Sequence, residues 1–565
     1  MKNMRKMNYN YSLNKHIFLI IGLIVCSCGI KKSVNNRPDL SVYNSTIPEK
    51  TIINDSTFIA GNSFLIKNKQ GLWELYIEGD PLERGLLTGS LTQHLMYKQE
   101  NVFFEKINEL VPSKGKQKFL RKFLSWYNRN MYKHIPEEFK TEIYGVSRFA
   151  SNNFNSIALP YLRSLYLHGA HDIGHALQDL ALVGCTSFAA WDDKTEDGKL
   201  LIGRNFDFYA GDAFAEDKIV AFINPDSGNK FMSVTWGGFI GVVSGMNEKG
   251  LTVTINAGKS KIPLAAKTPI SILTREILQY ASNIDEAIKI AKTREVFVSE
   301  SIMVGSASDG KAILIEVSPN NFDVYDVENT NQLICSNHFQ SKAYKDNNRN
   351  KKAIEESHTQ YRFDRMQELL DEEKRVNPTE AVSILRNKKG LNDKPIGFGN
   401  EKALNQLLAH HGIVFQPEDL KVWVSSNPYQ LGEFVAYDLN SVFKNRNENP
   451  SKVSVSASRF NIPEDPFVKT EAYANYETYR ILERQLEFAI KDKTKIDATQ
   501  LKKLVELNPN YWKAYKIVGD YYYQNKRFTK ALEAYSVALK KEITTVPDQE
   551  YILKYIKKSK RKANR

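Results

Sequence analysis

The chain has 565 residues, too many for one ordinary domain, and its 42% apolar content is enough to bury a core, so two or three globular units are expected. The formal net charge is +13 at pH 7. A basic balance suits nucleic acid or an anionic surface, but the sequence contains no recognised nucleic-acid-binding motif. We therefore expect no nucleic-acid partner.

Residues 1–28 have the pattern of a lipoprotein signal peptide. Basic residues precede the apolar run 17–25, which is too short to span a bilayer as a lone anchor. Cys26 and Cys28 follow this run, and Cys28 is the expected lipid-attachment residue, with Cys26 as the alternative. An uncleaved short membrane helix is the competing interpretation. The signal predicts a lipid-anchored protein of the bacterial cell envelope, in the periplasm or at the outer membrane and cell surface.

The next two segments differ in hydrophobic pattern. Residues 29–57 are polar and lack periodicity, which predicts a tether. Residues 58–184 begin with alternating apolar positions that predict a hairpin, and then repeat apolar residues at three- and four-residue steps. The second segment is therefore expected to be mostly helical.

A histidine-rich stretch near the end of that helical segment is a candidate metal site. Its members would share one face of a helix, and they are His168, His171, Asp172 and His175. The general-base Glu of an HExxH motif is missing and glycines interrupt the helix. We expect a structural role in positioning the segment before residue 184, and neither a metal nor a cofactor.

Two stretches around residue 185 combine a cysteine with a cation and a carboxylate. Cys185 opens a predicted buried strand, and a second strand ends at Arg204 and Asp207 after a turn at 197–198. Strands joined by a short turn lie side by side, so both charges are expected within a few ångströms of the sulfur. A guanidinium favours the reactive thiolate of a cysteine, whose free pKa is about 8.5. On spacing alone, a core cysteine beside an ordinary ion pair is equally compatible.

Four stretches in order resemble the N-terminal-nucleophile hydrolases that cut linear amides, a group with choloylglycine hydrolases, acid ceramidase and the penicillin acyltransferases (peptidase family C45-like). These stretches are 184–188 with 203–207, 245–256, 336–339 and 361–365. The resemblance implies an α+β fold in which residues 185–443 form a four-layer αββα core. Residues 58–184 would be the upstream pro-segment.

The resemblance also implies that the chain cuts itself. Cys185 would attack the carbonyl of Gly184, and an N-to-S acyl shift followed by hydrolysis would leave Cys185 as a new N-terminus. Its free α-amino group, with an unperturbed pKa of about 7.7–8.0, can then act as the base for its own thiol. Arg204 would hold the thiolate, and Asp207 would bind the new α-ammonium group.

Three downstream residues complete the implied site. Asn256 and Asn337 would donate side-chain N–H groups to an oxyanion, and Arg362 would supply a second cation. A turn position is the alternative for Asn256, and Arg365 is the alternative to Arg362.

Two further residues near these motifs have predicted roles outside the catalytic set. Cys335 is expected beside the site, with Cys185 and Cys335 both free thiols although the compartment is oxidising. His338 is expected to pack rather than act as a base.

The C-terminal part changes character. Residues 444–470 are rich in Asn, Glu, Pro and Ser, which predicts a linker, and residues 471–565 predict helices with a basic tail. Residues 511–540 resemble one tetratricopeptide (TPR) repeat. Because a lone repeat cannot bury its own face, this TPR-like region is expected to dock on the core, with binding of a protein partner as the alternative.

These observations predict an autoproteolytically activated cysteine amidohydrolase. Its substrate would be an N-acyl amide, such as an N-acyl amino acid, a conjugated bile acid or a lipid amide, cleaved through a thioester. An acyltransferase with an amine acceptor, a papain-like protease using Cys185 and His338, and a non-catalytic binding lipoprotein are the alternatives. The expected partners are the small-molecule substrate, the membrane and the chain's own cleaved N-terminal fragment.

Overall fold

In this computed structural model, the structure describes residues 30–170, 172, 184–259, 263, 265–444 and 453–564. The predicted signal peptide with Cys28, and also His171 and His175, lie outside these residues. Within the described ranges, no helix combines the length and the hydrophobicity needed to cross a bilayer.

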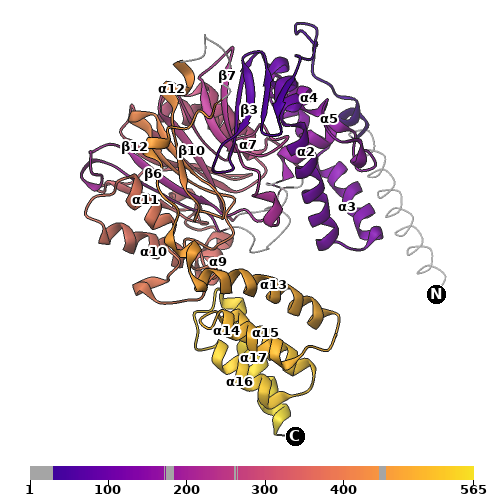
Figure 1. Cartoon of the computed structure of the whole chain (residues 1–565), viewed down its shortest axis with the longest axis vertical. Helices are drawn as coiled ribbons and strands as arrows, with labels where there is room; N and C mark the ends of the chain where they lie inside the picture. Colours follow the sequence, from indigo (N-terminus) through magenta and orange to yellow (C-terminus); the bar gives the residue numbers. More distant parts are fainter. Residues whose placement is uncertain are drawn as a thin grey trace, which may run out of the picture.

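Two β-sheets form the centre of the molecule (Figure 1). Among the described residues, the larger sheet has the strand order β1 (Thr51–Asn54), β2 (Thr57–Ala60), β3 (Ser63–Lys67), β4 (Trp73–Gly79), β7 (Ile219–Pro225), β8 (Phe231–Thr235), β9 (Ser244–Asn247), β10 (Leu251–Ala257), β11 (Glu300–Ser306), β12 (Lys311–Val317) and β13 (Phe322–Tyr325). The smaller sheet has the order β14 (Gln332–Cys335), β5 (Thr186–Ala190), β6 (Leu201–Phe206), β15 (His411–Gln416), β16 (Lys421–Ser425) and β17 (Phe434–Asp438). Neighbouring strands are antiparallel except β4 and β7, which are parallel.

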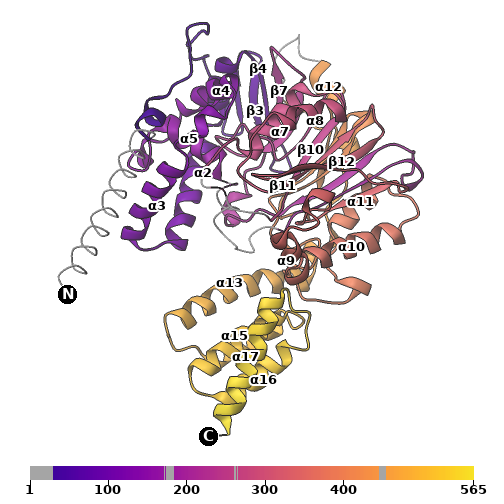
Figure 2. The same cartoon turned by 180° about the vertical axis from the view of Figure 1, so that it is seen from behind.

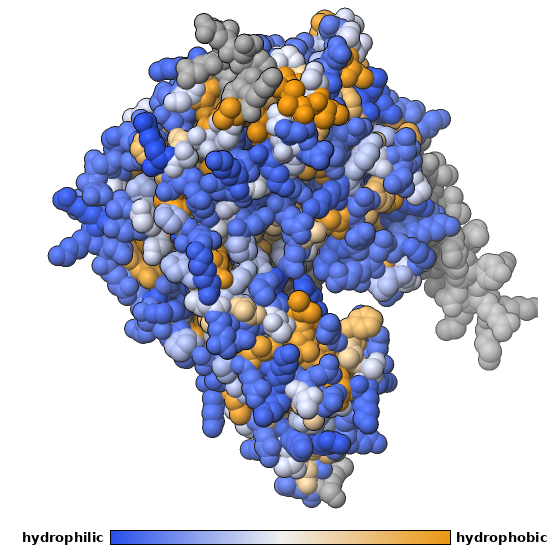
Figure 3. Space-filling view, viewed as in Figure 1, coloured by the Kyte–Doolittle hydropathy of each residue, from blue (hydrophilic) through white to orange (hydrophobic). Residues whose placement is uncertain are grey.

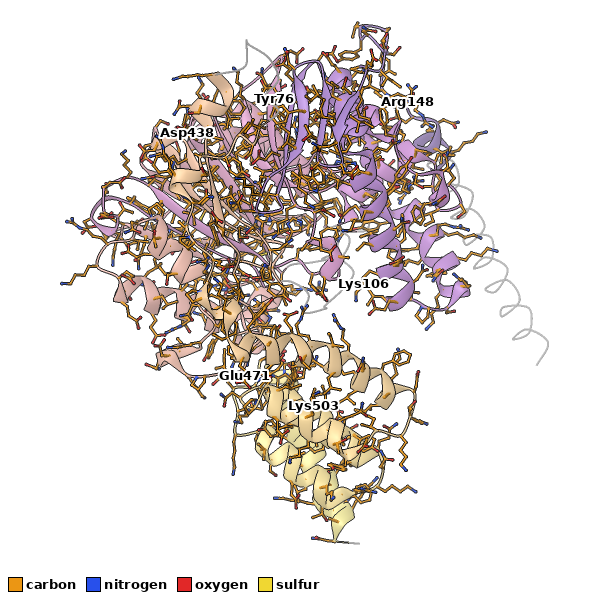
Figure 4. All side chains as sticks on the ribbon, viewed as in Figure 1. Tyr76, Lys106, Arg148, Asp438, Glu471 and Lys503 are labelled. Carbon is orange, nitrogen blue, oxygen red and sulfur yellow. The ribbon has the colours of Figure 1, made fainter. Side chains whose placement is uncertain are left out.

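Alternating side chains divide the interior into layers. In β3, Phe64 and Ile66 face the smaller sheet and join the cluster between the sheets, while Leu65 packs on the opposite face. In β7, Val220 and Phe222 likewise join the cluster between the sheets, whereas the residues next to them in sequence pack on the opposite face. This two-residue period is the geometry of a pleated strand with both faces buried. Side chains fill the space between the sheets (Figure 4).

Helices cover the outer faces of both sheets and complete the four-layer αββα order (Figure 2). On the larger sheet lie α2 (Pro81–Leu110), α7 (Ile270–Tyr280) and α8 (Ile284–Lys292), with α3 (Lys114–Tyr127), α4 (Glu137–Ser147) and α5 (Pro160–His168) beside α2. On the smaller sheet lie α10 (Thr359–Glu372) and α11 (Pro378–Leu385), with α9 (Asn348–Glu356) beside α10. α12 (Leu439–Lys444) follows β17 and packs into the cluster between the sheets. The α+β class and its αββα core are therefore as predicted.

The segment upstream of Cys185 is built into the core. Its strands β1 to β4 belong to the larger sheet, and β1 lies inside the stretch 29–57 that the composition predicts as a tether. Buried ion pairs join α2, α4 and α7, because Glu142 lies 2.9 Å from Arg84 and 3.2 Å from Arg275. The described residues of 58–184 are therefore structurally part of the core.

The C-terminal helices form a separate lobe below the core in Figure 1. They are α13 (Glu471–Lys491), α14 (Ala498–Leu507), α15 (Trp512–Gln524), α16 (Phe528–Ala538) and α17 (Val546–Ala563). Their shared apolar cluster includes Leu407 and Leu431 of the core, so the lobe is docked on the core. The visible face of the molecule is mainly hydrophilic, with apolar residues gathered on parts of this lobe (Figure 3).

The predicted linker 444–470 is ordered where it is described. Ile462 pairs with Phe434 of β17, and the backbone N–H of Ala457 donates to Ala436 at 2.7 Å. Residues 453–469 therefore lie along the edge of the smaller sheet and lead into α13.

Candidate active site

Cys185 directly precedes β5. The first residues of β5 are buried and pair with the last residues of β6. Ser187 is opposite Arg204 in the antiparallel pair, and Arg204 Nη2 lies 3.9 Å from the Cys185 sulfur. The thiol is 1% exposed. The structure thus brings the cysteine and the cation together at the short distance that the strand pairing predicts.

Backbone carbonyls fix the Arg204 guanidinium in place. Its Nη1 donates to Val243 O at 2.7 Å and also bonds Ser244, while Nη2 donates to Ile255 O. Burial raises the pKa of Cys185 to about 11, although Arg204 favours the thiolate. At neutral pH the sulfur in this uncut chain is therefore a protonated thiol.

Asp207 directly follows β6, at the end of the strand pair where Cys185 precedes β5. Both carboxylate oxygens are buried and have no hydrogen-bond partner among the described residues. Burial raises the pKa of Asp207 to about 7, an effect that Arg362 and Arg204 oppose. The backbone O of Asp207 accepts from Gly184 N at 3.5 Å. In the described part of the chain, a carboxylate without a hydrogen-bond partner therefore stands beside the Gly184–Cys185 junction.

Two donors converge on the carbonyl oxygen of Gly184. Arg362 Nη1 lies 2.7 Å away and Gln406 Nε2 lies 2.9 Å away. Arg362 Nη1 also contacts the Cys185 carbonyl at 2.7 Å and Thr186 Oγ1 at 2.5 Å. Burial lowers the pKa of Arg362 to about 10, so this side chain remains a cation at neutral pH.

The two predicted asparagines occupy different positions around this junction. Asn337 Oδ1 accepts from Arg362 Nη2 at 2.7 Å, and its Nδ2 donates to Ala257 O at 3.0 Å. Asn256 lies inside β10 rather than in a turn. Its Nδ2 donates to Cys335 O at 3.1 Å and its Oδ1 accepts from Ser187 at 2.9 Å. Asn337 is thus joined directly to Arg362, while Asn256 ties β10 to the smaller sheet.

Two residues considered as alternatives lie elsewhere. Arg365 forms ion pairs with Glu368 and Asp393, and only Arg362 of the two arginines reaches the Gly184–Cys185 junction. His338 Nδ1 lies 3.1 Å from Thr359 Oγ1, and burial lowers its pKa to about 4. His338 is therefore a neutral, packed side chain, which does not favour a papain-like pair. Cys335 is a free, buried thiol at the end of β14.

The described part of the histidine-rich stretch is structural. His168 Nε2 accepts from the backbone of Ile240 at 3.0 Å, so its Nδ1 is the donor to Ser164 O at 2.8 Å. Asp172 accepts from the backbone of Ile270, the first residue of α7, at 2.7 Å. Within the residues that the structure describes, no cluster of three or more metal-type ligands occurs.

A small aromatic pocket of about 50 Å³ includes in its lining Phe208, the residue after Asp207. Its lining includes Phe208, Phe214, Trp236 and Phe239 from the core, and Phe103 from α2 of the upstream segment. The chemistry of this lining favours an apolar group.

Gln406 is the site residue that the sequence does not reveal. It lies 222 positions after Gly184 in a segment without regular structure, between α11 and β15. No motif surrounds it, and only the folded chain brings it to the junction.

The comparisons with known proteins agree with this core. Residues 194–427 match the family model of acyl-coenzyme A:6-aminopenicillanic acid acyl-transferase. An uncharacterized protein of Archaeoglobus fulgidus is 27% identical over 281 residues, which are 45% of this chain and 45% of that protein. Protein dcd1B of Dictyostelium discoideum is 23% identical over 273 residues, 45% of this chain and 52% of that protein. The chain thus spans about half the length of the curated relatives it matches.

Two solved structures are also similar. A Caenorhabditis elegans ortholog of N-acylethanolamine-hydrolyzing acid amidase is 18% identical, covering 41% of this chain and 93% of that chain, with a TM-score of 0.30. A mutant of a conjugated bile acid hydrolase from Clostridium perfringens is 15% identical, covering 45% of this chain and 92% of that chain, with a TM-score of 0.31.

Proposed function

We propose that the core of this chain is a member of the N-terminal-nucleophile hydrolases of the choloylglycine hydrolase and penicillin acyltransferase group, which the family-model match over residues 194–427 supports, and that it is a self-activating cysteine amidohydrolase. The observation that carries this proposal is the arrangement at Cys185: a buried thiol 3.9 Å from a fixed guanidinium, with the carboxylate of Asp207, which has no hydrogen-bond partner among the described residues, beside the Gly184–Cys185 bond. The nucleophile stands mid-chain, so activation requires a break before Cys185.

The chemistry after that break follows from the groups present. The new α-amino group accepts the thiol proton, and the resulting ammonium group finds its counterion in Asp207. The thiolate attacks the carbonyl carbon of an N-acyl substrate, the amine leaves with a proton, and a thioester remains. Water then attacks the thioester and releases the acid. Asn337 and Asn256 are the proposed amide donors for the oxyanion in these steps.

The aromatic lining of the pocket favours an apolar acyl group as the part of the substrate that is bound nearby. Because α2 supplies part of the lining, the upstream fragment would remain with the enzyme after cleavage. Conjugated bile acids, N-acyl amino acids and lipid amides all have such an acyl group.

An acyltransferase is the second candidate, and the match to an acyl-transferase family model favours keeping it. Water and an amine compete for the same thioester, so the two functions differ only in the second half of the cycle. Attachment through Cys28 would place either activity at the bacterial cell envelope.

A substrate panel tests the proposal. Purified protein is incubated with N-acyl derivatives of glycine, taurine and ethanolamine, with and without an added amine, and released acid and new amide are quantified. Wild-type protein is expected to turn over at least one substrate, while Cys185→Ala loses turnover because the nucleophile is gone. Cys335→Ala is the matched control, since it removes the other described buried thiol and should keep turnover. Equal turnover by wild type and Cys185→Ala would contradict the proposed function.

A further inference from the structure

We propose that Arg362 and Gln406 form an oxyanion hole dedicated to the chain's own Gly184–Cys185 bond, which makes Gln406 a catalytic residue of self-cleavage. This inference rests on the proposed function and deepens it. It assigns a chemical task to a residue that carries no recognisable motif.

The geometry is that of an oxyanion hole. The two donors lie 2.7 Å and 2.9 Å from the same carbonyl oxygen, one from the Arg362 guanidinium and one from the Gln406 amide. Donors of oxyanion holes lie about 2.7–3.1 Å from the position that the oxyanion will occupy, and here both donors already contact the carbonyl oxygen from which that oxyanion forms. Gly184, Arg362 and Gln406 are all buried, so water does not compete for this oxygen. The charged donor strengthens the interaction further.

The surrounding chain holds Gln406 in this position. The preceding residue, Asn405, donates its backbone N–H to Asn387 O at 2.8 Å, and its side chain accepts from Leu407 N at 3.0 Å. Leu407 has a positive φ of 55° and packs into the apolar cluster of the C-terminal lobe. Gln406 is therefore fixed on both sides, by the core and by the docked lobe.

The contact also explains why residue 184 is a glycine. A Cβ atom at this position would clash with Gln406 Nε2 and would lie 2.5 Å from Gln406 Oε1. Glycine is required at position 184 because the Gln406 side chain lies so close to the backbone there. Any side chain at 184 would push the amide donor away from the carbonyl that it holds.

The step that these donors serve is balanced without an added reagent other than water. The Cys185 sulfur bonds to the carbonyl carbon of Gly184, and the negative charge that develops on the oxygen is held by Arg362 and Gln406. The bond from that carbon to the Cys185 nitrogen then breaks, and the thiol proton ends on this nitrogen, which becomes the free amine. Water cleaves the thioester, leaving a carboxylate on Gly184 and restoring the thiol.

The test measures the rate of self-cleavage in full-length protein. Wild-type and variant chains are made by rapid in vitro translation, and the fraction cut at Gly184–Cys185 is followed by mass spectrometry. Gln406→Ala is expected to slow cleavage by about 10²- to 10³-fold, the usual effect of losing one oxyanion donor. Gln430→Ala is the matched control, because Gln430 is equally buried and its amide has no partner among the described residues.

A second variant separates catalysis from folding. Gln406→Glu keeps the shape of the side chain but replaces the amide donor with a carboxyl group that donates only when protonated. Its cleavage rate is therefore expected to rise as pH falls, whereas the rate of the wild type should show no matching rise. Thermal unfolding of each substitution in a Cys185→Ala background checks that the uncut fold is retained.

Each outcome bears on one claim. Cleavage of Gln406→Ala at the rate of the wild type would overturn the role of Gln406 while leaving self-activation intact. Equal slowing in Gln406→Ala and Gln430→Ala, or no acid-dependent recovery in Gln406→Glu, would also overturn it. Wild-type protein that never forms the two fragments would instead contradict the proposed function itself.

Discussion

At the scale of single residues, the uncut chain keeps its two reactive groups in uncharged or weakly charged states. Burial raises the pKa of Cys185 to about 11 and that of Asp207 to about 7. A new ammonium group next to Asp207 would reverse the second effect, because an opposite charge favours the carboxylate. Self-cleavage thus supplies the base for the thiol and adds a cation next to Asp207, besides the existing effect of Arg362 and Arg204.

This environment predicts a pH-dependent gain in stability for Asp207→Asn, measured in a Cys185→Ala background that stays uncut. The folded pKa of about 7 lies above the ordinary value of 3.8, so the folded chain holds a proton that the unfolded chain has lost. The free-energy penalty for burying the ionised carboxyl of Asp207 is therefore absent below pH 3.8, grows as pH rises to 7, and is constant above pH 7.

Thermal unfolding from pH 4 to pH 9 checks this prediction. The melting temperatures of the Asp and Asn proteins should differ little at pH 4, diverge in favour of Asn up to pH 7 and then stay apart. Each pKa unit corresponds to about 1.4 kcal/mol, so the gain is on the order of a few kcal/mol. A gain that is largest at pH 4 would contradict the assignment.

The sequence located part of this site and missed part of it for a physical reason. The neighbourhood of Cys185 and Arg204 is predictable because one short connection joins their strands, and Arg362 is found through a resemblance. Gln406 is not predictable, since it reaches Gly184 only after α11 and the following segment have packed. The use of Asn256 as a tie between the two sheets is likewise a tertiary effect.

At the scale of elements, local pattern predicts strands and helices better than it predicts their partners. The alternation in 58–79 correctly indicates strands, but the parallel pairing of β4 with β7 joins residues 146 positions apart, from Trp73 opposite Ile219 to Gly79 opposite Pro225. No local signal indicates that pairing. It is the reason that the upstream segment belongs to the larger sheet rather than forming a removable appendage.

The crossing of α2 and α4 gives a prediction at this scale. A Cβ atom at Gly145 would lie 2.8 Å from backbone atoms of Gly85, so Gly145→Ala must separate the two helices. We expect a loss of about 1–3 kcal/mol in stability, the usual effect of overpacking. Chemical denaturation in the Cys185→Ala background measures it.

Gly115→Ala in α3 is the matched control for that prediction. A Cβ there meets only Ser113 Oγ at 3.9 Å, and alanine favours a helix over glycine by about 0.5–1 kcal/mol. This variant should be unchanged or slightly more stable. Equal losses in both variants would mean that the tight crossing of α2 and α4 does not contribute specifically.

At the scale of the whole molecule, three parts of the chain meet at one peptide bond. The upstream segment contributes Gly184 and core strands, the core contributes Cys185 with its arginines, and the C-terminal lobe supports the segment that carries Gln406. Glu542 of the lobe pairs with Lys394 and Lys402 at 2.7 Å each, and Tyr476 donates to Leu407 O at 3.5 Å. The docking of the lobe agrees with the expectation from its single repeat-like pattern, whereas a partner-binding role for it stays a prediction.

The proposed activity depends on a break of the chain before Cys185 that makes the enzyme active. The most direct measurement is a time course on freshly synthesised protein, in which intact-mass spectrometry and amide hydrolysis are followed together. We predict one fragment that ends at Gly184 and one that begins at Cys185, with hydrolytic activity rising in proportion to the cut fraction. An unbroken chain that hydrolyses amides at the full rate, or a break at another bond with Cys185 still internal, would contradict the account.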